Sequence, residues 1–196
     1  GGVQVICTDK TGTLTKNEMT VSALWCDNRE IKVSGVGYEP TGAFMENSGK
    51  TLTADPILRE ILQVAVLCSD AKLVEEQGRF IIKGDPTEGS LVVAGAKFGL
   101  HKEFLDQEYP RQAEIPFTSE SKRMTTLHKT SAGYIAATKG APEVILNICD
   151  KWLTATGEVI LNDDVKNNIL QAARKLASQG LRVMAIAERK NEADIN

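Results

Sequence analysis

The sequence predicts an α+β fold in which a largely antiparallel sheet is flanked by helices. Short apolar runs lie on both sides of tight-turn sequences at 27–28 and 76–78, a pattern typical of β-hairpins. Asp-Pro pairs at 55–56 and 85–86 begin segments whose apolar residues recur at helical spacing. Hairpins interrupted by helices favour an α+β arrangement, since parallel α/β sheets need strands and helices in regular alternation.

The composition is that of a globular domain able to bury a hydrophobic core. The chain has 196 residues, of which 42% are hydrophobic and 25% charged. Its net charge of −3 gives no indication of nucleic acid or an anionic membrane surface as a partner. No apolar run approaches the ~20 residues of a transmembrane helix. Cys7, Cys26, Cys68 and Cys149 form no CxxC pair, so we expect reduced and mostly buried thiols.

The first half of the chain is expected to contain strands, helices and one long loop. The apolar run at 3–6 predicts a buried strand over residues 1–9, which a polar loop over 10–18 follows. Residues 35–50 are rich in Gly, Ser, Asn and Pro and are predicted to be a loop. The further elements expected here are strands from Met19 to Trp25 and from Glu30 to Val36, a helix that begins at Asp55-Pro56, hairpin arms at 73–74 and 80–82, and a helix from Pro86 to Lys97.

The second half is expected to contain strands, then helices and a last strand. Gly99 is expected to end the helix that begins at Pro86, while Asn162 and Gly180 begin and end the longest helix. In chain order, the expected elements are a short helix over 102–107, strands over 114–117, 124–129 and 134–138, a helix from Pro142 to about Cys149, a turn at 156–157, a helix from Asn162 to Gly180, and a strand over 181–187.

One short segment carries the side chains that phosphoryl transfer needs. Residues 7–15 read Cys-Thr-Asp-Lys-Thr-Gly-Thr-Leu-Thr, so that Asp9 ends a buried strand and a glycine-containing turn follows. There the Asp9 carboxylate is a candidate nucleophile, placed where turn amides and Mg²⁺ can hold a phosphoryl group. Phosphatases built on such a turn use a second Asp two residues later as general acid and base, and Thr11 stands there instead. Since threonine shuttles protons poorly, an aspartyl-phosphate beside it should be long-lived, which suits energy storage better than phosphatase activity.

The string Asp9-Lys10-Thr11-Gly12-Thr13-Leu14-Thr15 is similar to the phosphorylation signature of P-type cation-pump ATPases. The resemblance implies that Asp9 is phosphorylated with Lys10 and Thr11 as catalytic neighbours, and that Asp9 and Thr11 bind Mg²⁺ in the full-length pump. It favours pumps of the calcium or Na⁺/K⁺ type, because the His-Pro pair expected of heavy-metal pumps is absent.

The resemblance also implies a division of the chain into parts of a larger pump. Residues 1–17 would be a strand of the haloacid-dehalogenase-like phosphorylation domain, residues 18–190 the nucleotide-binding domain, and residues 191–196 a frayed tail. The implied cofactors are ATP and Mg²⁺. The implied partners are the phosphorylation, actuator and transmembrane domains, without direct membrane contact by this segment. The parent would be an integral membrane ATP hydrolase that drives ion transport, with this domain on the cytoplasmic side.

Two segments are candidates for a nucleotide pocket. Phe117 lies among polar residues in the stretch 116–119, and an exposed ring near cations can stack on a base. Lys139-Gly140 places a lysine at a strand end and a glycine where a planar ring can approach the backbone. In the pumps, the residues that match Phe117 and Lys122 contact adenine or line its pocket, and those that match Lys139 and Gly140 line it as well. The plainer alternatives are that Phe117 fills the core and that Lys139 is solvated.

Glu88 and Arg182 complete the predicted pocket. Asp85 and Glu88 have the spacing of a capping box, and the resemblance implies that Glu88 also accepts a hydrogen bond near the adenine amino group. Arg182 opens the last strand, and its family counterpart reaches the nucleotide phosphates; a solvated charge is the alternative. Ser119 departs from calcium pumps of the sarcoplasmic-reticulum type, which carry Arg at this position. No Gly-x-x-x-x-Gly-Lys-Ser/Thr loop occurs, so ATP would be held by stacking and scattered cations.

Two other functions remain open: a haloacid-dehalogenase-type phosphatase with a large cap domain, and a nucleotide-binding module without catalysis. The pumps need later segments, namely a Lys, a Thr-Gly-Asp segment and a Gly-Asp-Gly-x-x-Asn-Asp magnesium site. Neither the Thr-Gly-Asp segment nor the Gly-Asp-Gly-x-x-Asn-Asp site occurs in this sequence. We therefore expect this chain to bind ATP without turning it over.

Overall fold

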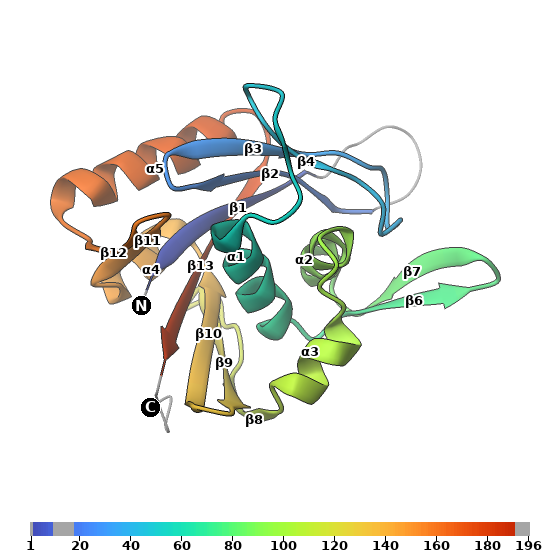
Figure 1. Cartoon of the computed structure of the whole chain (residues 1–196). Helices are drawn as coiled ribbons and strands as arrows, with labels where there is room; N and C mark the ends of the chain where they lie inside the picture. The colour runs from blue at the N-terminus through green and yellow to red at the C-terminus, as the bar shows by residue number, and fades with distance from the viewer. Residues whose placement is uncertain (1, 10–17, 191–196) are drawn as a thin grey trace.

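A nine-stranded sheet organises the computed structural model, which describes residues 2–9 and 18–190 (Figure 1). Its strands are β1 (Val3–Asp9), β2 (Thr20–Cys26), β3 (Arg29–Val33), β4 (Phe44–Glu46), β5 (Thr51–Leu52), β8 (Arg111–Ile115), β9 (Arg123–Thr130), β10 (Gly133–Gly140) and β13 (Arg182–Lys190). They are ordered β5-β4-β3-β2-β1-β13-β10-β9-β8, and neighbouring strands pair antiparallel throughout. The predicted α+β fold with a largely antiparallel sheet is confirmed.

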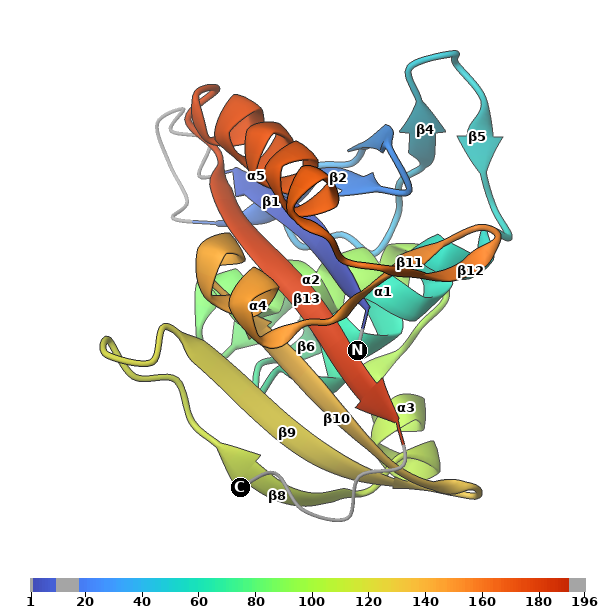
Figure 2. The same ribbon diagram turned by 90° about the vertical axis from the view of Figure 1, so that its left-hand side faces the viewer.

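Helices cover both faces of this sheet (Figure 2). They are α1 (Pro56–Leu67), α2 (Pro86–Lys97), α3 (Lys102–Glu108), α4 (Pro142–Ile148) and α5 (Asp163–Ala177). The first three lie on one face, and α4 and α5 lie on the other. Small hairpins are formed by β6 (Lys72–Glu76) with β7 (Arg79–Lys83), which projects from the body, and by β11 (Lys151–Thr154) with β12 (Gly157–Ile160). In the described part of the chain, no helix combines the length and apolar character needed to cross a membrane.

Alternating side chains on the central strands supply a hydrophobic core to each face. Along β1, Ile6 lies in the core beneath α1 and α2, whereas Val5 and Cys7 lie in the core beneath α4 and α5. Successive side chains of a strand point to opposite faces, so a strand with apolar residues at both parities is buried on both sides. The second core also holds Trp25, whose ring stacks on that of Trp152 with centroids 5.9 Å apart.

The helix starts and the first hairpin turn follow the predicted local chemistry. The Asp55 carboxylate accepts a hydrogen bond from the Leu58 amide at 2.9 Å, and the Asn162 side chain accepts one from the Val165 amide at 2.9 Å. Each side chain thereby satisfies an N–H group that the helix itself leaves unpaired. The turn residues 27–28 have φ of 50° and 58°, the positive values that a two-residue hairpin turn of the favoured twist requires. These predicted element boundaries are confirmed.

Four short strands of the described chain escaped prediction, namely β4, β5, β11 and β12. β4 lies within residues 35–50, which were predicted to be a loop. Three residues give too little alternation to reveal a strand, yet Phe44 is buried, with its ring edge-on to that of Phe98 at 5.3 Å. The predicted turn at 156–157 is the tip of the β11–β12 hairpin.

β1 lies at the centre of the sheet, between β2 and β13. Val5 is opposite Trp25 on one side and opposite Ala185 on the other. The predicted strand in residues 1–9 is therefore confirmed, while the predicted separation of residues 1–17 from residues 18–190 stays a prediction. Most of the predicted loop, and all of the predicted tail, lie outside the described residues.

Candidate functional site

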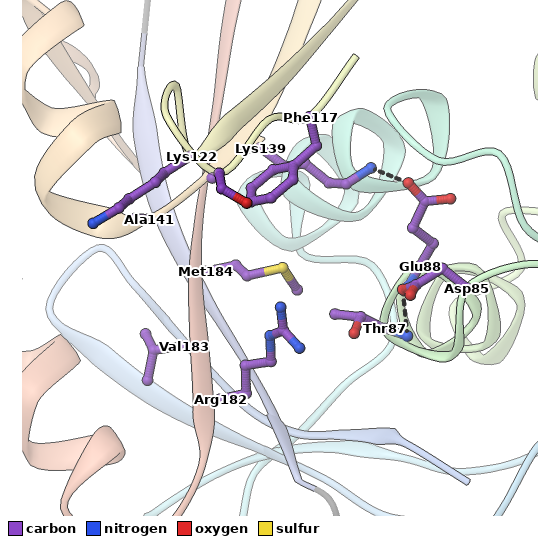
Figure 3. A pocket seen from close by; sticks show the side chains of 12 residues that line it. Asp85, Thr87, Glu88, Phe117, Lys122, Lys139, Ala141, Arg182, Val183 and Met184 are labelled. Atoms are coloured by element: carbon purple, nitrogen blue, oxygen red, sulfur yellow. Dashed lines mark hydrogen bonds and ion pairs between the residues drawn. The ribbon is translucent and has the colours of Figure 1, made fainter. Parts of the chain in front are cut away.

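A cavity of about 720 Å³ lies at one end of the sheet, where α2 begins (Figure 3). Its walls come from the start of α2, the segment after β8, the end of β10 and the start of β13. The lining residues are Asp85, Thr87, Glu88, Phe117, Ser119, Lys122, Lys139, Gly140, Ala141, Arg182, Val183 and Met184. The residues predicted to bind a nucleotide are all among them: Glu88, Phe117, Lys122, Lys139, Gly140 and Arg182.

Phe117 presents an exposed aromatic ring to this cavity, with 55% of its surface accessible. β8 ends two residues earlier, because Pro116 has no N–H group to donate to a sheet ladder. The predicted strand over 114–117 is thus wrong at its end, and the alternative that Phe117 fills the core is wrong as well. The Thr118 carbonyl accepts a hydrogen bond from the Lys122 amide at 2.8 Å, which closes a turn and brings Lys122 to the same cavity.

Lys139 is buried at the base of the cavity, so the alternative of a solvated lysine is wrong. Its Nζ donates to Glu88 Oε1 at 2.7 Å and to the Cys68 carbonyl, and it lies 3.2 Å from Met124 Sδ. Figure 3 marks the ion pair, in which the Glu88 side chain is only 14% exposed. Burial raises the pKa of the Cys68 thiol, which therefore stays protonated and donates to the Met124 carbonyl at 3.5 Å.

Glu88 joins α2 to the turn that follows α1. Its Oε2 accepts hydrogen bonds from the amides of Asp70 at 2.7 Å and Ala71 at 3.2 Å. Asp85 caps α2, since its Oδ1 accepts from amides of the first turn at 2.8 and 3.1 Å. The predicted N-cap is confirmed. The reciprocal half of the capping box is wrong, because the Glu88 carboxylate bonds to the turn after α1 instead of reaching back to the Asp85 amide.

Gly140 makes room for the chain's own backbone. A Cβ on Gly140 would lie 2.5 Å from the Lys122 carbonyl oxygen and 2.8 Å from Arg123 Cβ. The Ala141 amide donates to the same carbonyl at 3.0 Å, and Lys122 has a left-handed φ of 50°. On the side where a Cβ would lie, the turn that carries Lys122 fills the space. Gly140 also lines the cavity, and its contact with a planar ring stays a prediction.

Arg182 and Lys122 are exposed cations at the border of the cavity. The Arg182 guanidinium points into the cavity towards Met184 and Thr87, whereas the Lys122 side chain points away from Glu88 (Figure 3). Both cations are separate from the buried ion pair at the base. An aromatic face with a guanidinium and an ammonium group nearby suits a ligand that carries a planar base and phosphates.

The predicted phosphorylation motif begins at Asp9, which is the last residue of the first described range, 2–9. Asp9 is the last residue of β1, and its neighbour Thr8 lies opposite Arg182, so the end of β1 is close to the start of β13. Lys10 and Thr11 lie outside the described residues. Their catalytic roles and the Mg²⁺ site on Asp9 and Thr11 stay predictions. Among the side chains that are described, no group of three or more His, Cys, Asp or Glu could hold a metal ion.

No sequence motif indicated the turn that binds Glu88 and Lys139. Cys68 lies 71 positions from Lys139, and the Asp70 and Ala71 amides lie 18 and 17 positions from Glu88. The turn contributes only backbone atoms to these hydrogen bonds. Its residue types therefore do not indicate that it binds Glu88 and Lys139.

The sequence matches a known family over most of its length. The family described as "P-type ATPase, cytoplasmic domain N" matches residues 57–195. Over 94% of the chain, identity is 39% to "Probable cation-transporting ATPase F" of Mycobacterium tuberculosis. Over 98% of the chain, identity is 36% to "Cation-transporting ATPase pma1" of Synechocystis sp. and 35% to "Calcium-transporting ATPase" of Bacillus subtilis.

The antiparallel sheet, its helices and these matches define the class of the chain, which contains a cytoplasmic N domain of the P-type ATPase kind. The chain belongs to the P-type ATPase family, and its relatives include proteins named as cation- and calcium-transporting ATPases. The predicted resemblance is confirmed. The chain spans 20% to 22% of the length of these relatives.

Proposed function

We propose that the cavity binds ATP, and that this domain presents the γ-phosphate to Asp9 in a cation-transporting P-type ATPase. One arrangement carries the proposal: the exposed ring of Phe117 borders the same cavity as Lys122 and Arg182. Stacking a base on an aromatic side chain contributes about 1–3 kcal/mol. Cationic side chains add charge-assisted hydrogen bonds to phosphate oxygens. Together these interactions replace the glycine-rich loop that other ATP sites use.

With the donors in the described part of the chain counted, Glu88 offers one remaining hydrogen-bond position to the base. An ionised carboxylate has about four acceptor positions. Lys139 uses one on Oε1, and the Asp70 and Ala71 amides use two on Oε2. The remaining position on Oε1 suits the amino group of adenine, which would complement the stacking on Phe117.

The phosphates are proposed to lie towards Arg182 and Lys122. A guanidinium presents a fork of N–H donors that matches phosphate geometry. Thr8 lies opposite Arg182, and Asp9 ends β1 one residue later. Phosphates bound by Arg182 would therefore lie near the end of β1 that carries Asp9. Mg²⁺ bound with ATP would neutralise the phosphate charge, and the Asp9 carboxylate and Thr11 hydroxyl are oxygen ligands of the kind this ion prefers.

We extend the proposal to the longer protein: an integral membrane pump for a small cation such as Ca²⁺. Support comes from the match to a cytoplasmic N domain and from the relative named "Calcium-transporting ATPase". In this arrangement the domain lies on the cytoplasmic side, and its partners are the phosphorylation, actuator and transmembrane domains. By itself, the present chain is proposed to bind ATP without hydrolysing it.

Calorimetric titration of the chain with Mg²⁺-ATP tests the nucleotide site. Phe117→Ala should weaken binding about tenfold or more, because the stacking surface is lost. Phe104→Ala is the matched control, since this ring is 67% exposed on α3 and does not line the cavity. Calorimetry is preferable to tryptophan fluorescence, because Trp25 and Trp152 are buried in the second core. Absence of binding at millimolar ATP, or equal affinity for Phe117→Ala and the parent, would refute the proposal.

A further inference from the structure

The last residue of α1 and the turn that follows it, together called the 67–71 turn, support the base of the cavity. Its Cys68 carbonyl accepts a hydrogen bond from Lys139 Nζ. The amides of Asp70 and Ala71 bind Glu88, and Glu88 binds Lys139. The orientation of the buried ion pair therefore depends on where this turn is held.

Arg111 of β8 binds the same turn from another direction. Its Nη2 donates to the carbonyls of Leu67 at 3.2 Å and Ser69 at 3.1 Å. Its Nη1 donates to Asp70 Oδ1 at 2.5 Å and to Glu114 Oε2 at 2.8 Å. A surface ion pair would account for the carboxylate contacts alone. The Leu67 carbonyl ends α1 and the Ser69 carbonyl lies just beyond the Cys68 C-cap, so the guanidinium also complements the negative end of the helix dipole.

We propose that Arg111 is a positioning residue for the nucleotide site, acting through the 67–71 turn on Lys139 and Glu88. Arg111 is not among the residues that line the cavity. The Arg111 guanidinium links the turn to β8 through two carbonyls and a carboxylate. The turn then orients the Lys139–Glu88 ion pair through its backbone hydrogen bonds. This inference rests on the proposed ATP site, and it adds a residue that neither the cavity lining nor the family motifs point to.

Substitution of Arg111 should weaken ATP binding, although the Arg111 side chain does not line the cavity. Arg111→Gln is expected to lower the affinity about three- to tenfold, the size of a coupling carried through intervening side chains. Arg111→Lys should restore only part of the loss, because an ammonium group cannot bind two carbonyls and a carboxylate in the same fork geometry. Arg79→Gln removes the same charge from the projecting β6–β7 hairpin and should bind ATP like the parent.

Two readouts separate positioning from a general loss of stability. In ¹⁵N NMR spectra of the nucleotide-free chain, Arg111→Gln should shift and broaden the Asp70 and Ala71 amide signals, which report the bonds to Glu88. Arg79→Gln should leave both signals in place. In a Lys139→Met background, Arg111→Gln should weaken ATP binding by a smaller factor than it does in the parent, since one of the two groups to be positioned is gone.

The possible results distinguish this inference from the ATP proposal. If the parent binds no ATP, the proposed function fails, and the NMR comparison still decides whether Arg111 holds the turn. If the parent binds ATP and folded Arg111→Gln binds it within twofold, the positioning role is overturned. Unmoved Asp70 and Ala71 signals, or an undiminished effect of Arg111→Gln in the Lys139→Met background, would also overturn it.

Discussion

Gly140 lies where β10 meets the turn that carries Lys122, and the neighbouring backbone leaves no space for a side chain. Gly140→Ala should lower the free energy of unfolding by about 1–3 kcal/mol, as expected for an added methyl group in a filled site. Because the Cβ would press on the Lys122 carbonyl, the turn between Phe117 and Lys122 should move and ATP binding should weaken. Urea denaturation and calorimetric titration of the same variant measure the two effects.

Gly78→Ala is an informative control for this change. Gly78 has a φ of 73° at a hairpin tip, with nothing within 4 Å of an added Cβ. The substitution should cost about 1 kcal/mol through backbone conformation alone and leave ATP affinity unchanged. If Gly140→Ala kept the parental stability and ATP affinity, the site would not require the close approach of the Lys122 carbonyl to residue 140.

At the level of single residues, the sequence located the cavity better than it located the contacts within it. Lys139 and Arg182 lie at strand ends and Phe117 lies two residues beyond one, each in a short motif, and all three line the same cavity. Their partners could not be predicted, because Lys139 and Glu88 are 51 positions apart. A lysine at a strand end is usually solvated, and only the fold reveals that a carboxylate compensates its burial.

Among the helices and strands, prediction succeeded where an element carries its own start and stop signals. Proline after an acidic N-cap marks the start of α1 and α2. The pair Asp27-Asn28, two residue types that tolerate positive φ, marks the turn of the β2–β3 hairpin. β12 carries no such signal, because all its residues are exposed and no alternation results. β4 is likewise too short for a pattern. Both strands depend on partners, which a local pattern does not contain.

A cluster of Glu60, Glu188 and Lys190 joins α1 to the end of β13 and should make stability depend on pH. Lys190 Nζ lies 2.9 Å from Glu188 Oε1 and also donates to Glu60. Burial, with Glu60 nearby, raises the pKa of Glu188 from 4.5 to about 7. The stabilisation due to this raised pKa is fully present below about pH 4.5 and is lost as the pH rises through about 7. Glu188 should therefore lower stability at pH 8 relative to pH 5.

Glu188→Gln isolates this contribution from other titrating groups. The variant keeps a hydrogen-bonding side chain but cannot ionise, so it should gain of order 1–3 kcal/mol relative to the parent between pH 5 and pH 8. Urea denaturation at both pH values gives the difference, with Glu158→Gln on exposed β12 as control. A parent and variant whose stabilities change in parallel with pH would contradict the assignment.

Across the molecule, the position of β1 could not be predicted from its sequence. The apolar run at 3–6 indicates a buried strand, but a continuous run contains no information about which sheet receives it. The family resemblance assigned the strand to a separate domain. In the structure it lies between β2 and β13, where Val5 and Ile6 contribute to different cores. Pairing over long sequence separations decides this arrangement.

The present chain is expected to bind ATP without accepting its γ-phosphate. Phosphoryl transfer depends on placement and charge neutralisation, and the family resemblance assigns part of both to Thr-Gly-Asp and Gly-Asp-Gly-x-x-Asn-Asp segments that these 196 residues do not contain. Incubation with γ-labelled ATP and Mg²⁺ should therefore leave the protein unlabelled, although calorimetry detects binding. Asp9→Asn is the control for any label that does appear.

An acid-stable, hydroxylamine-sensitive label that Asp9→Asn abolishes would contradict this expectation, because only an acyl phosphate on that carboxylate behaves so. Hydrolysis of p-nitrophenyl phosphate would instead favour the phosphatase alternative. That activity needs a proton shuttle two residues after the nucleophile, where this chain has Thr11. Thr11→Asp supplies such a carboxylate, and it should raise phosphatase activity only if Asp9 already stands in a competent site. Binding without labelling, and no gain from Thr11→Asp, would together support the proposal that this chain binds ATP and that other segments of the longer protein complete the chemistry.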